Sequence, residues 1–92
     1  MIVSFRHKGL KRFYDSDDRS KLPADLIERI AIILASLDSA TQAEDMNRPN
    51  FRLHPLKGEL KGFHAVTVRS NWQIIFRFKD GNAFDVDFLD YH

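Results

Sequence analysis

The feature that most constrains the fold of this chain is a change in hydrophobic period near residue 50. Before it, apolar residues recur at helical spacing after Pro23, which suits a first helical turn because that position has no helical N–H bond to lose. The members of this stripe are Leu26, Ile27, Ile30, Ile33, Leu34 and Leu37. After residue 50 the period falls to two, in β-rich runs over 63–69, 72–78 and 83–89. The pattern predicts an α+β domain, with an antiparallel sheet packed on one face by N-terminal helices.

The remaining elements are expected to be short. Residues 1–5 are predicted to form a strand and residues 8–14 a helix. Two segments, 39–42 and 41–44, each fit the start of one more short helix, and the sequence does not choose between them. A chain of 92 residues has no room for a second core, so residues 1–92 are expected to form one domain.

The charge balance is uneven along the chain although the formal net charge is only +1. Bases gather at residues 6–12 and again at 52–61, whereas acids gather at 15–18 and 80–90. Such a chain can present one cationic face to a polyanion while staying soluble. Ordinary surface charge explains the same distribution equally well.

Several classes of protein are not expected. The chain has no cysteine, which excludes disulfides, thiolate nucleophiles and Cys-based zinc sites. The histidines, at positions 7, 54, 64 and 92, show no metal-ligand spacing, so neither a metal nor a cofactor is expected. No stretch is long and apolar enough to span a membrane, and the first residues lack the layout of a secretion signal. These features favour a cytoplasmic protein without membrane contact, in which His7 and His64 are structural or surface residues.

The register of the last two strands depends on the turn between them. Two apolar sets, each on one face of its strand, are Trp72, Ile74, Phe76 and Phe78, and Phe84, Val86 and Phe88. A two-residue turn at Asp80 and Gly81 would put the two sets on opposite faces of the sheet. A three-residue turn at 80–82, with a left-handed residue and a bulge, puts them on the same face. We therefore expect the three-residue turn.

Counting back from that turn predicts where polar residues meet. The expected pairs are Phe78 with Phe84, Ile74 with Phe88, and Trp72 with Asp90. The C-terminal run Asp90-Tyr91-His92 then lies beside the turn at 70–71, which is flanked by Arg69 and Gln73. Two polar clusters that are distant in sequence thus converge at one end of the sheet.

The residues of this cluster suit RNA cleavage by the RNA's own 2′-hydroxyl. That reaction needs a base, an acid and cations for the developing phosphate charge. Asp90, Tyr91 and His92 offer a carboxylate, an aromatic platform for an unstacked base, and an imidazole that titrates near neutral pH. Lys57 and Arg69 would face phosphates. By spacing alone, the same residues also fit exposed loops and a polar chain end.

Three segments resemble the HigB toxins, a branch of the RelE/ParE superfamily of bacterial toxin–antitoxin systems. They are residues 53–58 (LHPLKG), 66–72 (VTVRSNW) and 90–92 (DYH), and the likeness extends over essentially the whole chain. The resemblance implies a microbial-RNase-like fold and metal-independent, ribosome-dependent cleavage of mRNA in the ribosomal A site. It also implies a HigA-type helix-turn-helix antitoxin as partner, with operator DNA contacted only through that antitoxin.

The resemblance also implies roles for the site residues. His54 and His92 are similar to active-site histidines, Asp90 to a candidate proton acceptor, and Tyr91 to the residue that stacks on the substrate base. The assignment of acid and base among His54, Asp90 and His92 stays open.

A second group of residues is implied to bind the substrate. Lys57 and Arg69 resemble phosphate-stabilising cations, and Asn71 resembles a nucleotide contact. One position departs from the family pattern, because Gln73 stands where the family carries arginine. Loss of one such contact costs roughly ten- to a thousandfold in rate. Arg77 is predicted to lie on the same face of its strand as Gln73 and would compensate for it if the RNA shifts.

Two other functions remain as alternatives. ParE-like relatives act on a protein target, DNA gyrase, but such a toxin would not need Asp90-Tyr91-His92. A catalytically weak member that serves mainly as a corepressor bound to its antitoxin is favoured only by Gln73.

Overall fold

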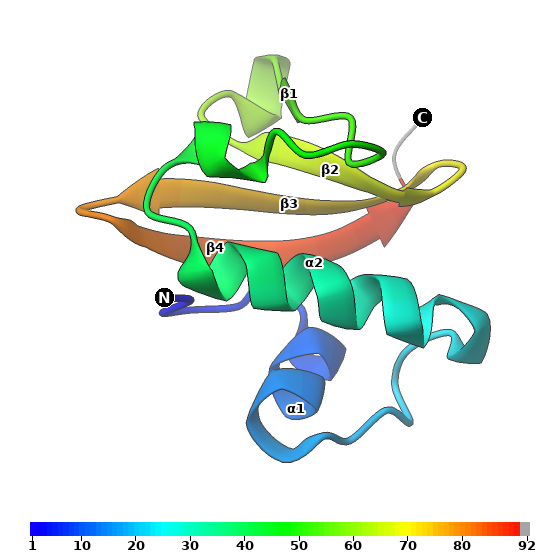
Figure 1. Ribbon diagram of the computed structural model, residues 1–92. Coiled ribbons are helices and arrows are strands. Elements are labelled where there is room, and N and C mark those ends of the chain that lie inside the picture. The colour runs from blue at the N-terminus through cyan, green and yellow to red at the C-terminus, as the bar shows by residue number, and fades with distance from the viewer. Residues whose placement is uncertain (91–92) are drawn as a thin grey trace.

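The computed structural model describes residues 1–90, which form a four-stranded antiparallel sheet in the order β1-β2-β3-β4, with helices on one face (Figure 1). The strands are β1 His54–Pro55, β2 His64–Arg69, β3 Trp72–Lys79 and β4 Asn82–Asp90. The helices are α1 Lys8–Ser16 and α2 Ile27–Ser39, with short 3₁₀ turns η1 Ala24–Leu26, η2 Ala43–Met46 and η3 Gly58–Leu60. The predicted α+β class, with an antiparallel sheet and N-terminal helices, is confirmed.

Helix α2 lies across the sheet and buries its apolar stripe against it. All six predicted stripe residues, from Leu26 to Leu37, are buried. They join Val66, Ile74, Phe76 and Val86 of the sheet in one core. Each such side chain contributes about 1.5–3 kcal/mol when it is removed from water. This core therefore fixes the position of α2 on the sheet.

The N-terminal segment runs beside β4 but does not form the predicted strand. It makes two isolated parallel bridges, Ile2 with Ala83 and Phe5 with Val86. Between these positions β4 bulges, and the Asp85 amide donates to the Ser4 hydroxyl at 2.9 Å. The bulge interrupts the ladder, so the segment stays extended without becoming a regular strand.

The short helix expected near residue 40 is the 3₁₀ turn η2. Gln42 caps this turn, because its side chain accepts from the Asp45 amide. The Asp45 carboxylate in turn accepts from the amides of Thr41 and Gln42. The capping pair thus begins one residue after the start of the second predicted segment.

The turn between β3 and β4 has two residues, so the predicted three-residue turn is wrong. Asp80 and Gly81 both have positive φ, 54° and 80°, as a tight hairpin turn requires, and Lys79 pairs with Asn82. Phe78 consequently pairs with Ala83, and not with Phe84 as predicted.

The extra residue lies inside β4, at a bulge around Asp85. Arg77 pairs with Phe84, yet Ile75 pairs with Asp87, so β4 has one residue more than β3 over this interval. Asp85 has the left-handed φ of 54° that such a bulge uses. Beyond the bulge the predicted pairs of Ile74 with Phe88 and Trp72 with Asp90 are confirmed. Before it, Ala83 joins the helix-side core, whereas Phe84, paired with Arg77, lies on the other face.

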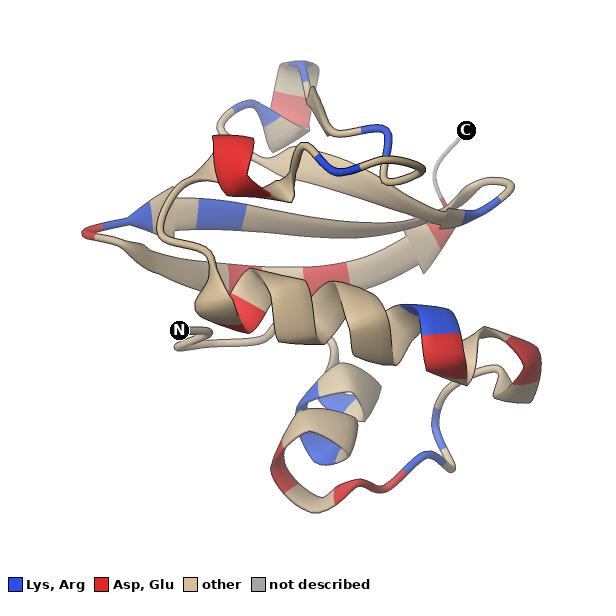
Figure 2. Cartoon of the chain, in the orientation of Figure 1, with Lys and Arg blue, Asp and Glu red and all other residues tan. Residues whose placement is uncertain are grey.

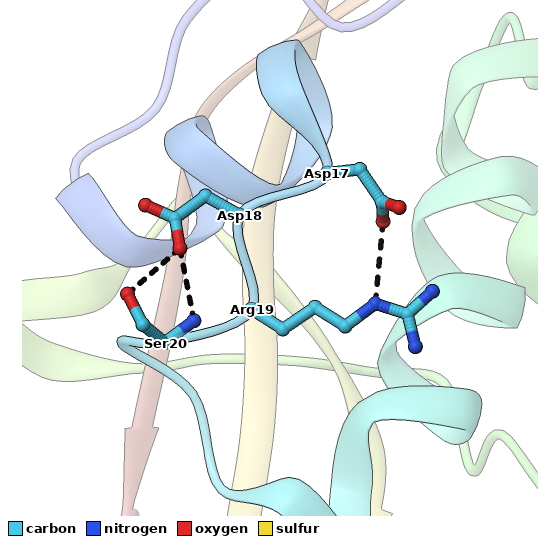
Figure 3. A network of polar contacts seen from close by, with 4 residues as sticks. All are labelled: Asp17, Asp18, Arg19 and Ser20. Carbon is cyan, nitrogen blue, oxygen red and sulfur yellow. Dashed lines mark hydrogen bonds and ion pairs between the residues drawn. The ribbon is translucent and has the colours of Figure 1, made fainter.

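The loop that follows α1 is held by contacts between near neighbours (Figure 3). The Asp18 carboxylate accepts from the amide and the hydroxyl of Ser20, at 3.0 and 2.7 Å. These bonds hold the pKa of Asp18 below its ordinary value. Asp17, in the left-handed cap position of α1, pairs with the Arg19 guanidinium at 3.3 Å. The loop lies below α1, at the end of the molecule away from β1 (Figure 1).

Candidate active site

The face of the sheet that points away from α2 is called the second face here. Its central residues, at alternate positions of β2 and β3, are Ala65, Thr67, Gln73, Ile75 and Arg77. A small apolar cluster covers part of it, where Leu56 and Phe63 of the preceding loop pack on Ala65 and Ile75. Most of the predicted site residues lie on this face or at its end.

His54 lies on the second face because it pairs with Ala65 across β1 and β2. Its Nδ1 is 2.7 Å from the carbonyl oxygen of Arg52. A carbonyl oxygen can only accept, so Nδ1 carries the proton in this contact. The half-buried imidazole is therefore oriented, and Nε2 is left as the nitrogen for proton transfer. Arg52 itself is in the left-handed region, with a φ of 54°.

Lys57 immediately precedes η3, in the loop that follows β1. The loop is anchored on both sides of this residue, because Leu56 is buried and its amide donates to the Phe63 carbonyl at 2.9 Å. Gly58 has a φ of +67°, a conformation that side chains rarely adopt. Lys57 is exposed and directly follows Leu56, which packs on the second face.

Gln73 lies on the second face two residues before Ile75 on β3, and it is buried, with 7% of its surface exposed. It pairs with Thr67, whose hydroxyl donates to its Oε1 at 3.4 Å, and on its other side with Leu89. A neutral, packed amide thus stands at the position where the family resemblance expects a cation.

The predicted cluster at the end of the sheet is partly assembled in the described residues. Asp90 is exposed opposite Trp72, and Asn71 is exposed in the preceding turn. Trp72 stacks on Phe88 with ring centroids 4.8 Å apart and packs against the core, which gives it a structural role. The predicted catalytic residues Tyr91 and His92 lie outside the described residues.

Arg69 is held toward the helix side at this end of the sheet. Its guanidinium forms an ion pair with Asp25 of η1, and both side chains are largely exposed. The hydrogen bond from Arg69 holds the pKa of the Asp25 carboxyl below its ordinary value. The structure therefore gives Arg69 a carboxylate partner that sequence reasoning did not anticipate.

Arg77 lies on the same face as Gln73, as predicted, but toward the opposite end. The two are four residues apart, about 13 Å along an extended strand. The Arg77 guanidinium pairs with Asp85 at 2.7 Å and lies over the rings of Phe84 and Phe63, 4.6 and 5.1 Å from their centroids. In Figure 2 the basic segments of β3 lie beside the acidic segments of β4. The structure does not bring Arg77 to the position of Gln73.

Sequence reasoning missed Arg29, the one basic residue of α2 (Figure 2). Its guanidinium donates to the carbonyl oxygens of Asn50, Thr67 and Val68, and it lies 5.1 Å over the Phe51 ring. Strand β2 bulges between residues 67 and 69, where carbonyls lose their ladder partners. A lone arginine in an apolar helix was the available signal for a side chain that satisfies backbone groups elsewhere.

Two histidines have structural roles, as predicted. His7 caps α1, since its Nδ1 accepts from the Leu10 amide at 3.1 Å, and His64 stacks on Phe76. Within residues 1–90 no three metal-ligating side chains gather. Over the same residues, no helix has both the length and the apolar character to cross a membrane. A hollow of about 610 Å³ between α1 and α2 contains none of the predicted site residues.

Comparison with known proteins gives a match over nearly the whole chain. Residues 3–92 match the HigB-like toxin family, described as the RelE-like toxin of the type II toxin–antitoxin system HigB. The chain is 44% identical over 92 residues to Endoribonuclease HigB of Proteus vulgaris, with both chains covered completely. It is 34% identical over 94 residues to Toxin HigB-1 of Vibrio cholerae, covering 100% of this chain and 98% of that protein.

Solved structures share the fold at low sequence identity. The YoeB dimer from Staphylococcus aureus matches with a TM-score of 0.62 at 16% identity, covering 100% of this chain and 97% of that one. The YoeB/ParE toxin from Agrobacterium tumefaciens matches with a TM-score of 0.56 at 13% identity, covering 100% and 99%. These likenesses confirm the predicted RelE-like fold.

Proposed function

Because the chain belongs to the HigB-like family of RelE-like toxins from type II toxin–antitoxin systems, we propose that it is an endoribonuclease that cuts mRNA in the ribosomal A site. The observation that carries the proposal is the 44% identity, over the full length of both proteins, to a relative named as an endoribonuclease. The orientation of His54 on the second face supports the chemistry.

In the proposed reaction the RNA's 2′-hydroxyl attacks the adjacent phosphorus and the 5′-oxygen leaves. The nucleophile belongs to the substrate, so the protein has to move protons and stabilise charge. His54 does the first at Nε2, together with Asp90 and His92. Tyr91 stacks on a base of the substrate.

Charge on the reacting phosphate is stabilised by Lys57 and Arg69, with Asn71 contacting a nucleotide. Binding by Arg69 exchanges its exposed Asp25 partner for a phosphate. An ion pair this exposed to solvent contributes little to stability, so the exchange costs little. Gln73 contributes a neutral contact, which weakens stabilisation of the phosphate at its position.

The proposed partners follow from the same family membership. A HigA-type helix-turn-helix antitoxin would bind the toxin, and the complex would contact operator DNA through the antitoxin. Support comes from a solved structure of the same fold, the heterotetrameric YoeB-YefM toxin–antitoxin complex from Staphylococcus aureus, which matches with a TM-score of 0.61 at 16% identity. Action on mRNA at the ribosome implies a cytoplasmic protein that needs no membrane.

The proposal is tested with purified protein and ribosomes programmed with a defined mRNA, with the ends mapped by primer extension. We expect cleavage in the A site, reduced about a hundredfold to ten-thousandfold in His54→Ala and in His92→Ala, since each loses a proton-transfer group. His7→Asn is the matched control, because asparagine also caps helices well. It is expected to cleave at the wild-type rate.

Three other outcomes would change the assignment. Intact mRNA together with inhibited DNA gyrase would contradict cleavage and support a toxin with a protein target. Wild-type cleavage too slow to detect, but restored by Gln73→Arg, would support a catalytically weak corepressor. Equal cleavage by wild type and His54→Ala would remove His54 from the reaction.

A further inference from the structure

A cation that the proposed mechanism does not use reaches the second face from the N-terminal segment. The Arg6 amide donates to the Val86 carbonyl at 2.8 Å, which holds this segment against the outer edge of β4. The preceding residue, Phe5, packs against the helix-side core. The Arg6 side chain extends the other way, and its Cζ lies 5.6 Å from the centroid of the Phe63 ring.

The surroundings of Arg6 form a row of alternating rings and cations. Arg77 pairs with Phe84 across the strands, and its Cζ lies over both Phe84 and Phe63. Two guanidinium groups, from segments distant in sequence, therefore contact the Phe63 ring. Phe63 directly precedes β2 and is two residues from Ala65, which pairs with His54. The row therefore lies about 7 Å from the position of His54.

The two arginines of the row differ in their available charge. Arg77 is paired with Asp85 at 2.7 Å, so its charge is largely compensated. Arg6 is exposed and takes part in none of the ion pairs formed within residues 1–90. Asp87 shares this face, but its Oδ1 accepts from the Phe88 amide at 2.9 Å. Among the described residues, Arg6 thus presents to solvent an aromatic-supported guanidinium that forms no ion pair with a carboxylate.

We propose that Arg6 binds a phosphate of the RNA strand beside the one that is cleaved. This assignment rests on the proposed endoribonuclease function and extends its substrate contacts to the end of the second face away from Gln73. A guanidinium presents a planar fork of donors that matches two phosphate oxygens. The Phe63 ring restricts the long side chain before the substrate binds, which reduces the ordering cost of binding. Arg77 and Phe84 support the Phe63 ring from the sheet.

The test compares Arg6→Gln with a matched control, Arg19→Gln. Arg19 also lies over a phenylalanine ring, 5.8 Å from the Phe13 centroid, but in the loop after α1, remote from the second face. In single-turnover cleavage on programmed ribosomes, we expect Arg6→Gln to be roughly tenfold to a hundredfold slower, the range for one hydrogen bond to a charged group. The cleavage rate of Arg6→Lys should fall between those of wild type and Arg6→Gln, and Arg19→Gln should cleave at the wild-type rate. Thermal unfolding checks that all variants fold.

A second measurement separates phosphate binding from a structural role. The mRNA carries one neutral methylphosphonate at a time, on a 2′-deoxy nucleotide near the cleaved bond. Wild type should lose rate at one such position, and Arg6→Gln should be insensitive there while both keep equal sensitivity elsewhere. Wild-type rate in Arg6→Gln, or an equal loss of rate in both proteins at every position, would overturn the assignment. Wild type that cleaves no mRNA would overturn the proposed function itself, and this assignment with it.

Discussion

The two faces of the sheet are built by the same strands but serve different purposes. Toward α2, β2 and β3 contribute Val66, Ile74 and Phe76, all fully buried in the larger core. On the second face, the positions between them hold Thr67 and Gln73, a polar pair with a hydrogen bond of 3.4 Å. Because alternate residues of a strand point to opposite sides, each strand supports stability with one half of its residues and leaves the other half for the site.

The largest effect is expected from removing a side chain on the helix side. Phe76 is fully buried and contacts the rings of His64 and Phe78. Phe76→Ala should lower the free energy of unfolding by about 3–5 kcal/mol, because it leaves a cavity that the core cannot refill. Urea denaturation followed by circular dichroism measures this change. If Phe76→Ala does not fold, Phe76→Leu gives a smaller loss in the same direction.

Ile32→Ala is the control for that measurement. Ile32 lies on the outer side of α2 and is 54% exposed, so its truncation should change the free energy of unfolding by no more than about 0.5 kcal/mol. Equal losses at Ile32 and Phe76 would show that the helix-side core does not dominate stability.

The helix-side face was predictable from the sequence because burial imposes a period. The stripe from Leu26 to Leu37 and the β-rich runs have the spacing that a helix and strands need, and the structure confirms both elements. The pairs Ile74 with Phe88 and Trp72 with Asp90 were also predicted, since only a register with one extra residue in the hairpin aligns the apolar sets. That argument counts the extra residue but does not locate it, so it was placed in the turn and not at Asp85.

The second face was less predictable because its side chains are positioned by individual contacts and not by a hydrophobic period. Nothing in the sequence pairs Arg69 with Asp25, or Arg77 with Asp85, since these contacts join segments whose relative placement depends on the fold. Gln73 is buried and its amide oxygen accepts from the Thr67 hydroxyl, whereas the sequence pattern treats both residues only as polar positions. Motif resemblance therefore suggested which residues form the site, while their partners required the structure.

The next effect concerns the bulge that divides β4 between the two faces. Asp85 has a φ of 54°, a conformation that glycine adopts freely and valine does not. Asp85→Gly and Asp85→Val both remove the carboxylate paired with Arg77, so the loss of that ion pair cancels when the two variants are compared. We expect the valine variant to be less stable by about 1–2 kcal/mol, measured by urea denaturation. Equal stabilities would mean that the left-handed residue of the bulge is not Asp85, and would undo the assignment of Phe84 to the second face.

The smallest effect is expected at a polar contact on the helix side, which titrates without touching the second face. The Asp38 carboxylate accepts from the Tyr14 hydroxyl at 2.6 Å and from the Ile2 amide at 2.9 Å. The Tyr14 bond, followed by the Ile2 bond, holds the pKa of Asp38 below its ordinary 3.8, and the same contact raises the pKa of Tyr14 to about 12. A carboxyl whose pKa is lower in the folded state stabilises the fold above its unfolded pKa, and that stability is lost as pH falls through the folded value.

Asp38→Asn should therefore lower the free energy of unfolding near neutral pH by less than about 1 kcal/mol, because the contact is largely exposed to solvent. The difference from wild type should begin to shrink as the pH falls below about 4, where the unfolded chain takes up the proton first. It should disappear once the pH is below the lowered pKa of the folded Asp38 carboxyl. Spectrophotometric titration in a Tyr91→Phe background should show the Tyr14 pKa falling from about 12 toward its ordinary 10.0. The pH dependence of mRNA cleavage should stay that of wild type, because neither Asp38 nor Tyr14 is among the groups proposed to react. A cleavage profile that shifts with Asp38→Asn would mean that the two faces are coupled.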